Sequence, residues 1–163
     1  MMYLVECKPD EILIKVLTNT SRKQIQHAGN KSELLKKLTE HFTNSKGMVD
    51  EDPLSHQPRH LQMFKEKQKL AIYDLKILHQ KSGNNILIML CPRLEDWILK
   101  AAYEANVNFA KYGLPNNPEK LHEQINIKTD KFQKLVDDIG TKSERLKKLK
   151  QYLLHNCEVF IFR

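Results

Sequence analysis

The first 52 residues alternate short apolar segments with amphipathic helical patterns, and this alternation restricts the possible folds more than any other feature of the chain. Residues 2–6, 23–27 and 46–49 have the length and composition of short strands. Between them, apolar residues recur at helical spacing within residues 9–17 and 30–42. The order strand, helix, strand, helix, strand is typical of a parallel sheet with helical crossovers. The sequence therefore predicts an α/β protein.

The rest of the chain predicts two more strands and a helical C-terminal part. Polar residues 53–69 predict a loop with one short helix, and residues 70–78 and 84–90 predict strands. Further helices are expected at residues 92–105, 119–124, 129–139 and 143–155. Residues 158–163 are expected to be a last edge strand or a loose tail. A chain of 163 residues suggests one domain, with residues 1–90 as its core and residues 91–163 as a mainly helical extension packed on it.

The chain carries a net charge of +7, and this excess is unevenly distributed. Residues 1–52 hold equal numbers of basic and acidic side chains, so the whole excess lies in residues 53–163. The last predicted helix contributes a basic segment made of Lys142, Arg145, Lys147, Lys148 and Lys150. Such a segment either contacts nucleic-acid phosphates or is the solvated side of an amphipathic helix. Nucleic acid is therefore an expected partner.

Several protein classes are excluded by what the sequence does not contain. No apolar segment approaches the roughly 20 residues that cross a bilayer, and residues 1–8 lack the pattern of a signal peptide. The 3 Cys include no CxxC pair, which argues against a disulfide scaffold or a cysteine-rich zinc site. A cytoplasmic protein that does not associate with membranes is expected.

Acidic side chains follow two of the three predicted strands. Glu6 ends the first strand, Asp50 and Asp52 follow the third, and Asp10 lies in the first turn of the helix after Glu6. Ligands of open α/β sheets bind at the carboxyl ends of strands, so these four carboxylates are expected to converge. Carboxylates are preferred ligands of Mg²⁺, and the pattern predicts one or two such ions. Glu51 is expected either to face away from these ions or to lie next to the side chains that bind them.

A simpler interpretation of these acids remains open. Acidic residues stabilise helix N-termini through the helix dipole, and they also occupy solvated loops. Glu95 and Asp96 have the same two interpretations, since they follow the last apolar strand and lie in the first turn of the next predicted helix. Glu95 is expected either near the metal ligands or as a favourable charge at that helix N-terminus.

Three segments together resemble the Toprim fold, in their order as well as their content. Residues 4–10 (Leu-Val-Glu-Cys-Lys-Pro-Asp), followed by an apolar helix, resemble its opening motif. Residues 49–52 (Val-Asp-Glu-Asp) match its Asp-x-Asp motif after a later strand. Residues 27–31 resemble the middle of small Toprim-like proteins. The spacing between Glu6 and Asp10 is similar to that of the OLD-type nucleases within this family.

This resemblance covers about residues 2–90 and implies a phosphodiester-acting site that depends on Mg²⁺ or Mn²⁺. It implies that Glu6 is a general acid/base or a metal ligand, that Asp50 and Asp52 hold the metal, and that Asp10 is a further ligand. The implied activity is that of a nuclease acting on DNA or RNA. Stand-alone proteins of this kind often belong to antiphage or nucleic-acid maintenance systems, some with a separate ATPase partner, and a homo-oligomer is compatible with this picture.

One departure from the family pattern favours a second function class. Cys7 stands where the family usually has Gly, a residue that allows a ligand to approach the backbone closely. The alternative is a non-catalytic module that binds nucleic acid or a protein partner. The intact acidic pattern favours the enzyme, and the Cys7 position favours the binding module.

Overall fold

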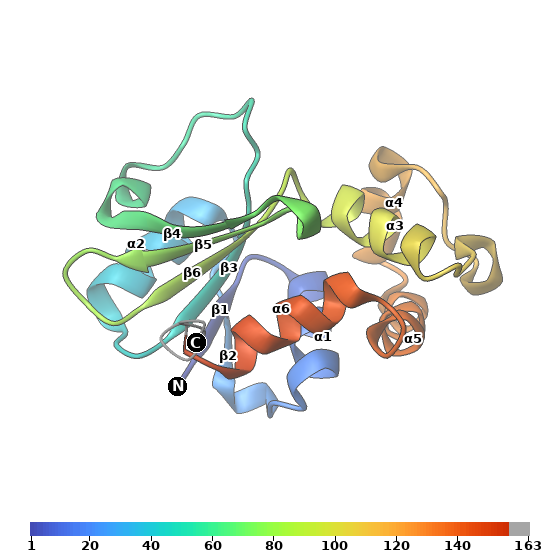
Figure 1. The fold of residues 1–163 in the computed structure, drawn as a ribbon, viewed down its shortest axis with the longest axis horizontal. Helices are drawn as coiled ribbons and strands as arrows, with labels where there is room; N and C mark the ends of the chain where they lie inside the picture. The colour runs from blue at the N-terminus through green and yellow to red at the C-terminus, as the bar shows by residue number, and fades with distance from the viewer. Residues whose placement is uncertain (157–163) are drawn as a thin grey trace.

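The computed structural model of the protein describes residues 1–156, which form a mixed six-stranded sheet with helices on both faces (Figure 1). The strand order is β2-β1-β3-β6-β5-β4. The α/β class predicted from the sequence is therefore confirmed. The predicted edge strand or tail at residues 158–163 lies outside the described residues.

Four strands run parallel and form one side of the sheet. They are β2 (Ile25–His27), β1 (Tyr3–Val5), β3 (Lys46–Asp50) and β6 (Ile86–Leu90). The strands β5 (Leu75–Gln80) and β4 (Phe64–Leu70) extend the sheet in antiparallel pairing. Because β1, β3 and β6 point the same way, their carboxyl ends meet at one edge of the sheet.

Helices cover both faces of the sheet and the carboxyl ends of its parallel strands. The helix α2 (Lys31–His41) lies on one face, whereas α1 (Lys8–Thr18) and α6 (Glu144–Leu154) lie on the other (Figure 1). The helices α3 (Leu94–Glu104), α4 (Pro118–Ile125) and α5 (Thr129–Gly140) lie beyond the carboxyl ends of the strands (Figure 1). No helix in the described part of the chain is long and apolar enough to cross a bilayer.

The helix α2 packs closely on the sheet because β3 has a glycine beneath it. A Cβ atom at Gly47 would lie 2.8 Å from Leu34 Cδ2 and 2.9 Å from Leu38 Cδ2. Both leucines are fully buried in the smaller apolar cluster between α2 and the sheet. Any side chain at position 47 would therefore push α2 away from β3.

The larger apolar cluster joins the N-terminal strands to the C-terminal helices. It contains Tyr3 and Val5 of β1, Ile88 of β6, and buried residues of α5 and α6 such as Val136 and Leu149. The helices predicted after residue 90 are thus packed onto the same core as the first strands. Trp97, which is only 1% exposed, lies in this cluster and donates its Nε1–H to the backbone oxygen of Tyr73 at 2.8 Å.

The structure differs from the sequence prediction most clearly at β4. Residues 53–69 were expected to form a loop with one short helix, and a 3-10 helix does occupy residues Arg59–Met63. The chain then forms the seven-residue strand β4, of which only Phe64 is fully buried. As the edge strand of the sheet, β4 exposes most of its side chains, so it lacks the apolar pattern of an inner strand.

A buried lysine fastens α6 to the sheet. Lys46 of β3 is 2% exposed, and its Nζ donates to the backbone oxygens of Tyr152, Leu153 and His155 at 2.6, 2.9 and 2.7 Å. Tyr3 of β1 donates its hydroxyl to the same Leu153 oxygen at 2.8 Å. The ammonium group thus satisfies carbonyls at the C-terminus of α6, where the helix dipole also favours a positive charge.

We predict that Lys46→Met destabilises the protein by about 2–4 kcal/mol, because it removes a buried ammonium group that donates to three carbonyl oxygens at the end of α6. Chemical denaturation of wild type and variant measures the difference. Lys147→Met, which removes an exposed lysine of α6, serves as the control and should change stability by less than about 0.5 kcal/mol. Equal stability of the Lys46 variant and the wild type would contradict this account.

Candidate functional site

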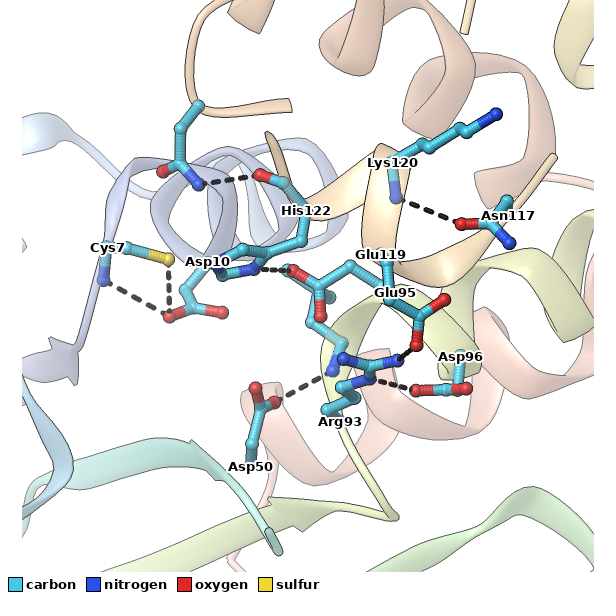
Figure 2. Close-up of polar contacts among 12 residues, drawn as sticks. Cys7, Asp10, Asp50, Arg93, Glu95, Asp96, Asn117, Glu119, Lys120 and His122 are labelled. Carbon is cyan, nitrogen blue, oxygen red and sulfur yellow. Dashed lines mark hydrogen bonds and ion pairs between the residues drawn. The ribbon is translucent and has the colours of Figure 1, made fainter. Parts of the chain in front are cut away.

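Acidic side chains from several elements come together at the carboxyl edge of the parallel strands. Glu6 directly follows β1, Asp50 ends β3, and Asp52 lies two residues further on. Asp10 lies in the first turn of α1, and Glu95 lies in the first turn of α3. Figure 2 shows Asp10, Asp50 and Glu95 extending into the same region. We refer to Glu6, Asp10, Asp50 and Asp52 as the carboxylate cluster.

Asp10 is fixed by the start of α1. Its Oδ2 accepts hydrogen bonds from the backbone N–H and from the Sγ of Cys7, both at 3.2 Å. This arrangement is a capping box in which Cys7 takes the N-cap position, and Pro9 supplies a favoured early helical residue. Cys7, which departs from the Toprim pattern, therefore holds a carboxylate of the cluster in place.

Asp50 connects β3 to α3. Its Oδ1 accepts the backbone N–H of Leu94 at 2.9 Å, at the N-terminus of α3 (Figure 2). This carboxylate satisfies a backbone donor that has no partner within the helix. The simpler interpretation, that the acids stabilise helix N-termini, is therefore correct in part. One carboxylate oxygen of Asp10 and one of Asp50 have this role.

Glu6 has one carboxylate oxygen that no hydrogen bond accounts for. Its Oε1 is buried and has no hydrogen-bond partner within the described residues. Burial, together with the charges of Asp10 and Asp52, raises the pKa of Glu6 to about 7. The ammonium of Lys31 and the backbone N–H of Asp50 act in the opposite direction.

The other buried members of the cluster are also difficult to ionise. Burial raises the pKa of Asp50 to about 9, with further contributions from the charges of Asp10, Glu6 and Glu95. Burial likewise raises the pKa of Asp10 to about 6, and its hydrogen bonds from Cys7 only partly offset this increase. The cluster therefore holds negative charge at an energetic cost that a nearby cation would reduce.

One lysine lies close to these acids. Lys31 of α2 donates its Nζ to the backbone oxygen of Glu51 at 2.9 Å and to Gln57 Oε1 at 2.8 Å. Burial lowers its pKa, whereas the charges of Asp52, Glu6 and other nearby acids raise it. Gln57 Nε2 donates a hydrogen bond to the backbone oxygen of Asp52 at 2.9 Å, so the same network holds the loop after β3 in place.

Glu51 points away from the cluster, one of the two placements that the sequence suggests. It forms an ion pair with Lys76 of β5. Glu51, Lys76 and Cys91 line a small cavity of about 180 Å³ together with Lys69 of β4. Burial raises the pKa of the Cys91 thiol to about 12, so this cysteine is a poor nucleophile.

The cluster suits a hard divalent cation in its donor atoms and charge, but it does not form a closed coordination sphere. Within residues 1–156, no group of three or more His, Cys, Asp or Glu side chains is arranged to hold a metal ion. The cluster does offer carboxylate oxygens, the donor type that binds Mg²⁺ or Mn²⁺, and one of them, Glu6 Oε1, is buried without a hydrogen-bond partner. Asp10 and Asp50 each already use one oxygen in a hydrogen bond to the backbone.

The predicted nucleic-acid-binding segment at the C-terminus needs a correction. Arg145 is 1% exposed, donates to Glu104 and Asp74 at 2.8 Å, and lies over the ring of Trp97. It is a core residue of α6 and cannot contact a phosphate. Each of the four lysines of the segment has a different environment. Lys142 forms an ion pair with Asp138, and Lys147 forms one with Glu144. Lys148 lies over the ring of Tyr73, and Lys150 is exposed.

The structure adds two residues that the motifs did not predict. Lys31 is the last residue of the segment, residues 27–31, that resembles small Toprim-like proteins, so that resemblance was the only available signal. His122 of α4 contacts Glu95 Oε1 through its Nδ1 at 2.7 Å, across 27 residues of sequence (Figure 2). No local pattern indicates such a contact, because the Asn117-capped helix α4 is brought to α3 only by tertiary packing.

Comparison of this chain with models of known protein families, with curated proteins and with solved structures gives no match.

We predict that Asp50→Asn stabilises the protein at alkaline pH in the absence of divalent metal. The amide oxygen still accepts the Leu94 N–H, while the buried charge is removed. Aspartate in an unfolded chain titrates near pH 4, so the raised pKa makes wild type lose stability as pH rises from about 4 to about 9. Denaturant unfolding should show a variant more stable by on the order of 1–3 kcal/mol at pH 8, with no gain at pH 4.

Glu123→Gln, which changes an exposed acid on α4, is the matched control and should leave the pH dependence of stability unchanged. If Asp50→Asn and wild type have the same stability at pH 8, the Asp50 carboxyl is not held at an electrostatic cost, and our description of the cluster is wrong.

Proposed function

We propose that this protein acts on phosphodiesters of DNA or RNA with the help of Mg²⁺ or Mn²⁺, at the carboxylate cluster of a Toprim-like sheet. Three features support the Toprim-like identity. Two short parallel strands, β1 and β3, are neighbours in the sheet, each is followed by an acidic motif, and the helix α1 connects the first motif to the core. The antiparallel strands β5 and β4 are additions on the far side of β6.

The observation that carries the proposal is the crowding of carboxyl groups at a partly buried site, where burial and mutual repulsion oppose their ionisation. Three carboxyl groups of the cluster, those of Asp52, Glu6 and Asp50, act on the charge of one ammonium group, that of Lys31. Such a site repels a phosphodiester on its own. A divalent cation removes this conflict, because it relieves the repulsion among the acids and attracts the phosphate oxygens.

The chemistry of the individual side chains is consistent with hydrolysis. A bound divalent ion would polarise the phosphoryl oxygens and increase the acidity of a water molecule. Glu6 and Asp52, together with the remaining oxygens of Asp50 and Asp10, would hold it. A carboxyl group with a pKa near 7, as in Glu6, suits the acceptance of a proton from water near neutral pH. Lys31 is the ammonium group available to contact a phosphate oxygen.

A second candidate is a non-catalytic module that binds nucleic acid or a protein partner. It is favoured by the hydrogen bonds that Asp10 and Asp50 make to the starts of α1 and α3, since these roles need no metal. The two functions differ in their response to metal ions. The binding module needs no divalent cation for its fold or for its partner.

We predict that Mg²⁺ or Mn²⁺ at millimolar concentration raises the melting temperature of wild type by about 3–6 °C. Binding to the native state alone stabilises it by about 1.4 kcal/mol when the ion is at ten times its dissociation constant. Asp50→Asn/Asp52→Asn should not respond. Glu33→Gln/Glu40→Gln, which removes the same charge from exposed positions of α2, should respond like wild type. If wild type does not respond, the binding module becomes the better description.

A second prediction concerns the path of the nucleic acid. Lys69 is exposed on β4 and lies opposite Lys76 of β5, close to the loop that carries Asp52. Lys69→Ala should weaken binding of a labelled 20-nucleotide single strand and reduce the slope of its salt dependence by about 1. Lys147→Ala should change neither, because Lys147 lies on α6 and is paired with Glu144. The reverse result would place the strand along α6.

A further inference from the structure

His122 and Glu95 form a carboxylate–histidine pair beside the carboxylate cluster. Glu95 is 4% exposed, and its Oε1 lies 2.7 Å from His122 Nδ1 (Figure 2). A carboxylate accepts hydrogen bonds and does not donate them, so Nδ1 is the donor. The bond fixes the plane of the imidazole ring and leaves Nε2 as the atom that gains or loses a proton.

The other side of the ring is open to a ligand. The His122 side chain is 65% exposed, although the carboxyl group that orients it is buried. Nε2 makes no hydrogen bond within the described residues. A histidine that served only to join α4 to α3 would gain nothing from leaving this nitrogen in solvent.

The pair is held in a fixed position relative to the cluster. Leu121 and Ile125, on either side of His122 in α4, are fully buried. Arg93, at the start of α3, donates its Nη2 to Glu119 in the first turn of α4 at 2.7 Å. The charge of Glu95 contributes to the raised pKa of both Asp10 and Asp50, so the pair borders the cluster directly.

We propose that His122 is the general acid that protonates the leaving oxygen of the phosphodiester, with Glu95 as its positioning residue. This inference rests on the proposed function. Water forms a new P–O bond and gives its proton to the Glu6 carboxylate. The bond between phosphorus and the leaving oxygen breaks, and that oxygen receives the Nε2 proton of the imidazolium. The products are a phosphate monoester and a free hydroxyl; Glu6 then releases its proton to solvent, and His122 takes up a proton from solvent.

The test compares His122→Asn with wild type on two substrates in the presence of Mg²⁺ or Mn²⁺. The Asn amide can still donate to Glu95 but has no group that transfers a proton. On labelled 20-nucleotide DNA and RNA strands, kcat should fall about 100-fold or more. On thymidine 5′-p-nitrophenyl phosphate it should fall less than about 10-fold, because p-nitrophenolate leaves without a proton.

Two controls keep the outcomes separate. His41→Asn, which changes another exposed histidine, should behave like wild type on both substrates. The melting temperature of His122→Asn and its response to metal should match those of wild type. An equal loss on both substrates, or no loss on either, overturns the role of His122 while the proposed function stands. If wild type cleaves neither substrate with either metal, the proposed function itself fails and the inference fails with it.

Discussion

The cost of keeping several carboxyl groups together, away from bulk water, is the constraint on which the candidate site depends. The parallel direction of β1 and β3 brings Glu6 and Asp50 to one edge of the sheet, where neither can be fully solvated. Neighbouring helices relieve part of this cost, because the starts of α1 and α3 turn their N-terminal ends toward the acids. Lys31 relieves another part from α2. The remaining charge is what makes the site suited to a cation.

The helices that surround the site depend on a few buried polar contacts with the sheet. Lys46 fixes the end of α6 to β3, and Asp50 fixes the beginning of α3 to the same strand. Arg145 connects α6 to Glu104 of α3 and to Asp74, which precedes β5. Each contact uses a charged side chain to satisfy a helix terminus or another charge, so the C-terminal helices are positioned by electrostatics as well as by apolar packing.

The sequence predicted most elements but fewer of the contacts between them. The inner strands β1 and β6 are buried on both faces and appear in the sequence as continuous apolar segments. The edge strand β4 escaped prediction because its polar side chains lie in water. The placement of Arg145 was wrong for a related reason. Helical spacing shows which residues share one side of a helix, but it cannot show that a charged residue on that side is buried against acids from two other elements.

The acidic motifs predicted the location of the site, because parallel strands place the residues at their carboxyl ends along one edge of the sheet. The pairing of Glu95 with His122 could not be predicted, since it depends on how α4 packs against α3. Long-range pairs of this kind have no local periodicity, and a single sequence carries no signal for them. The loop network formed by Lys31 and Gln57 has the same character.

The chemistry of Asp50 argues against a purely structural role for the cluster. An asparagine at this position would accept the Leu94 N–H equally well and would carry no charge into a partly buried site. Glu6 strengthens the argument, because its buried Oε1 satisfies no backbone donor within the described residues and still adds to the repulsion. Residues that make a fold less stable than their neutral analogues are typical of functional sites. This cost supports the proposal that the cluster binds a cation in addition to capping helices.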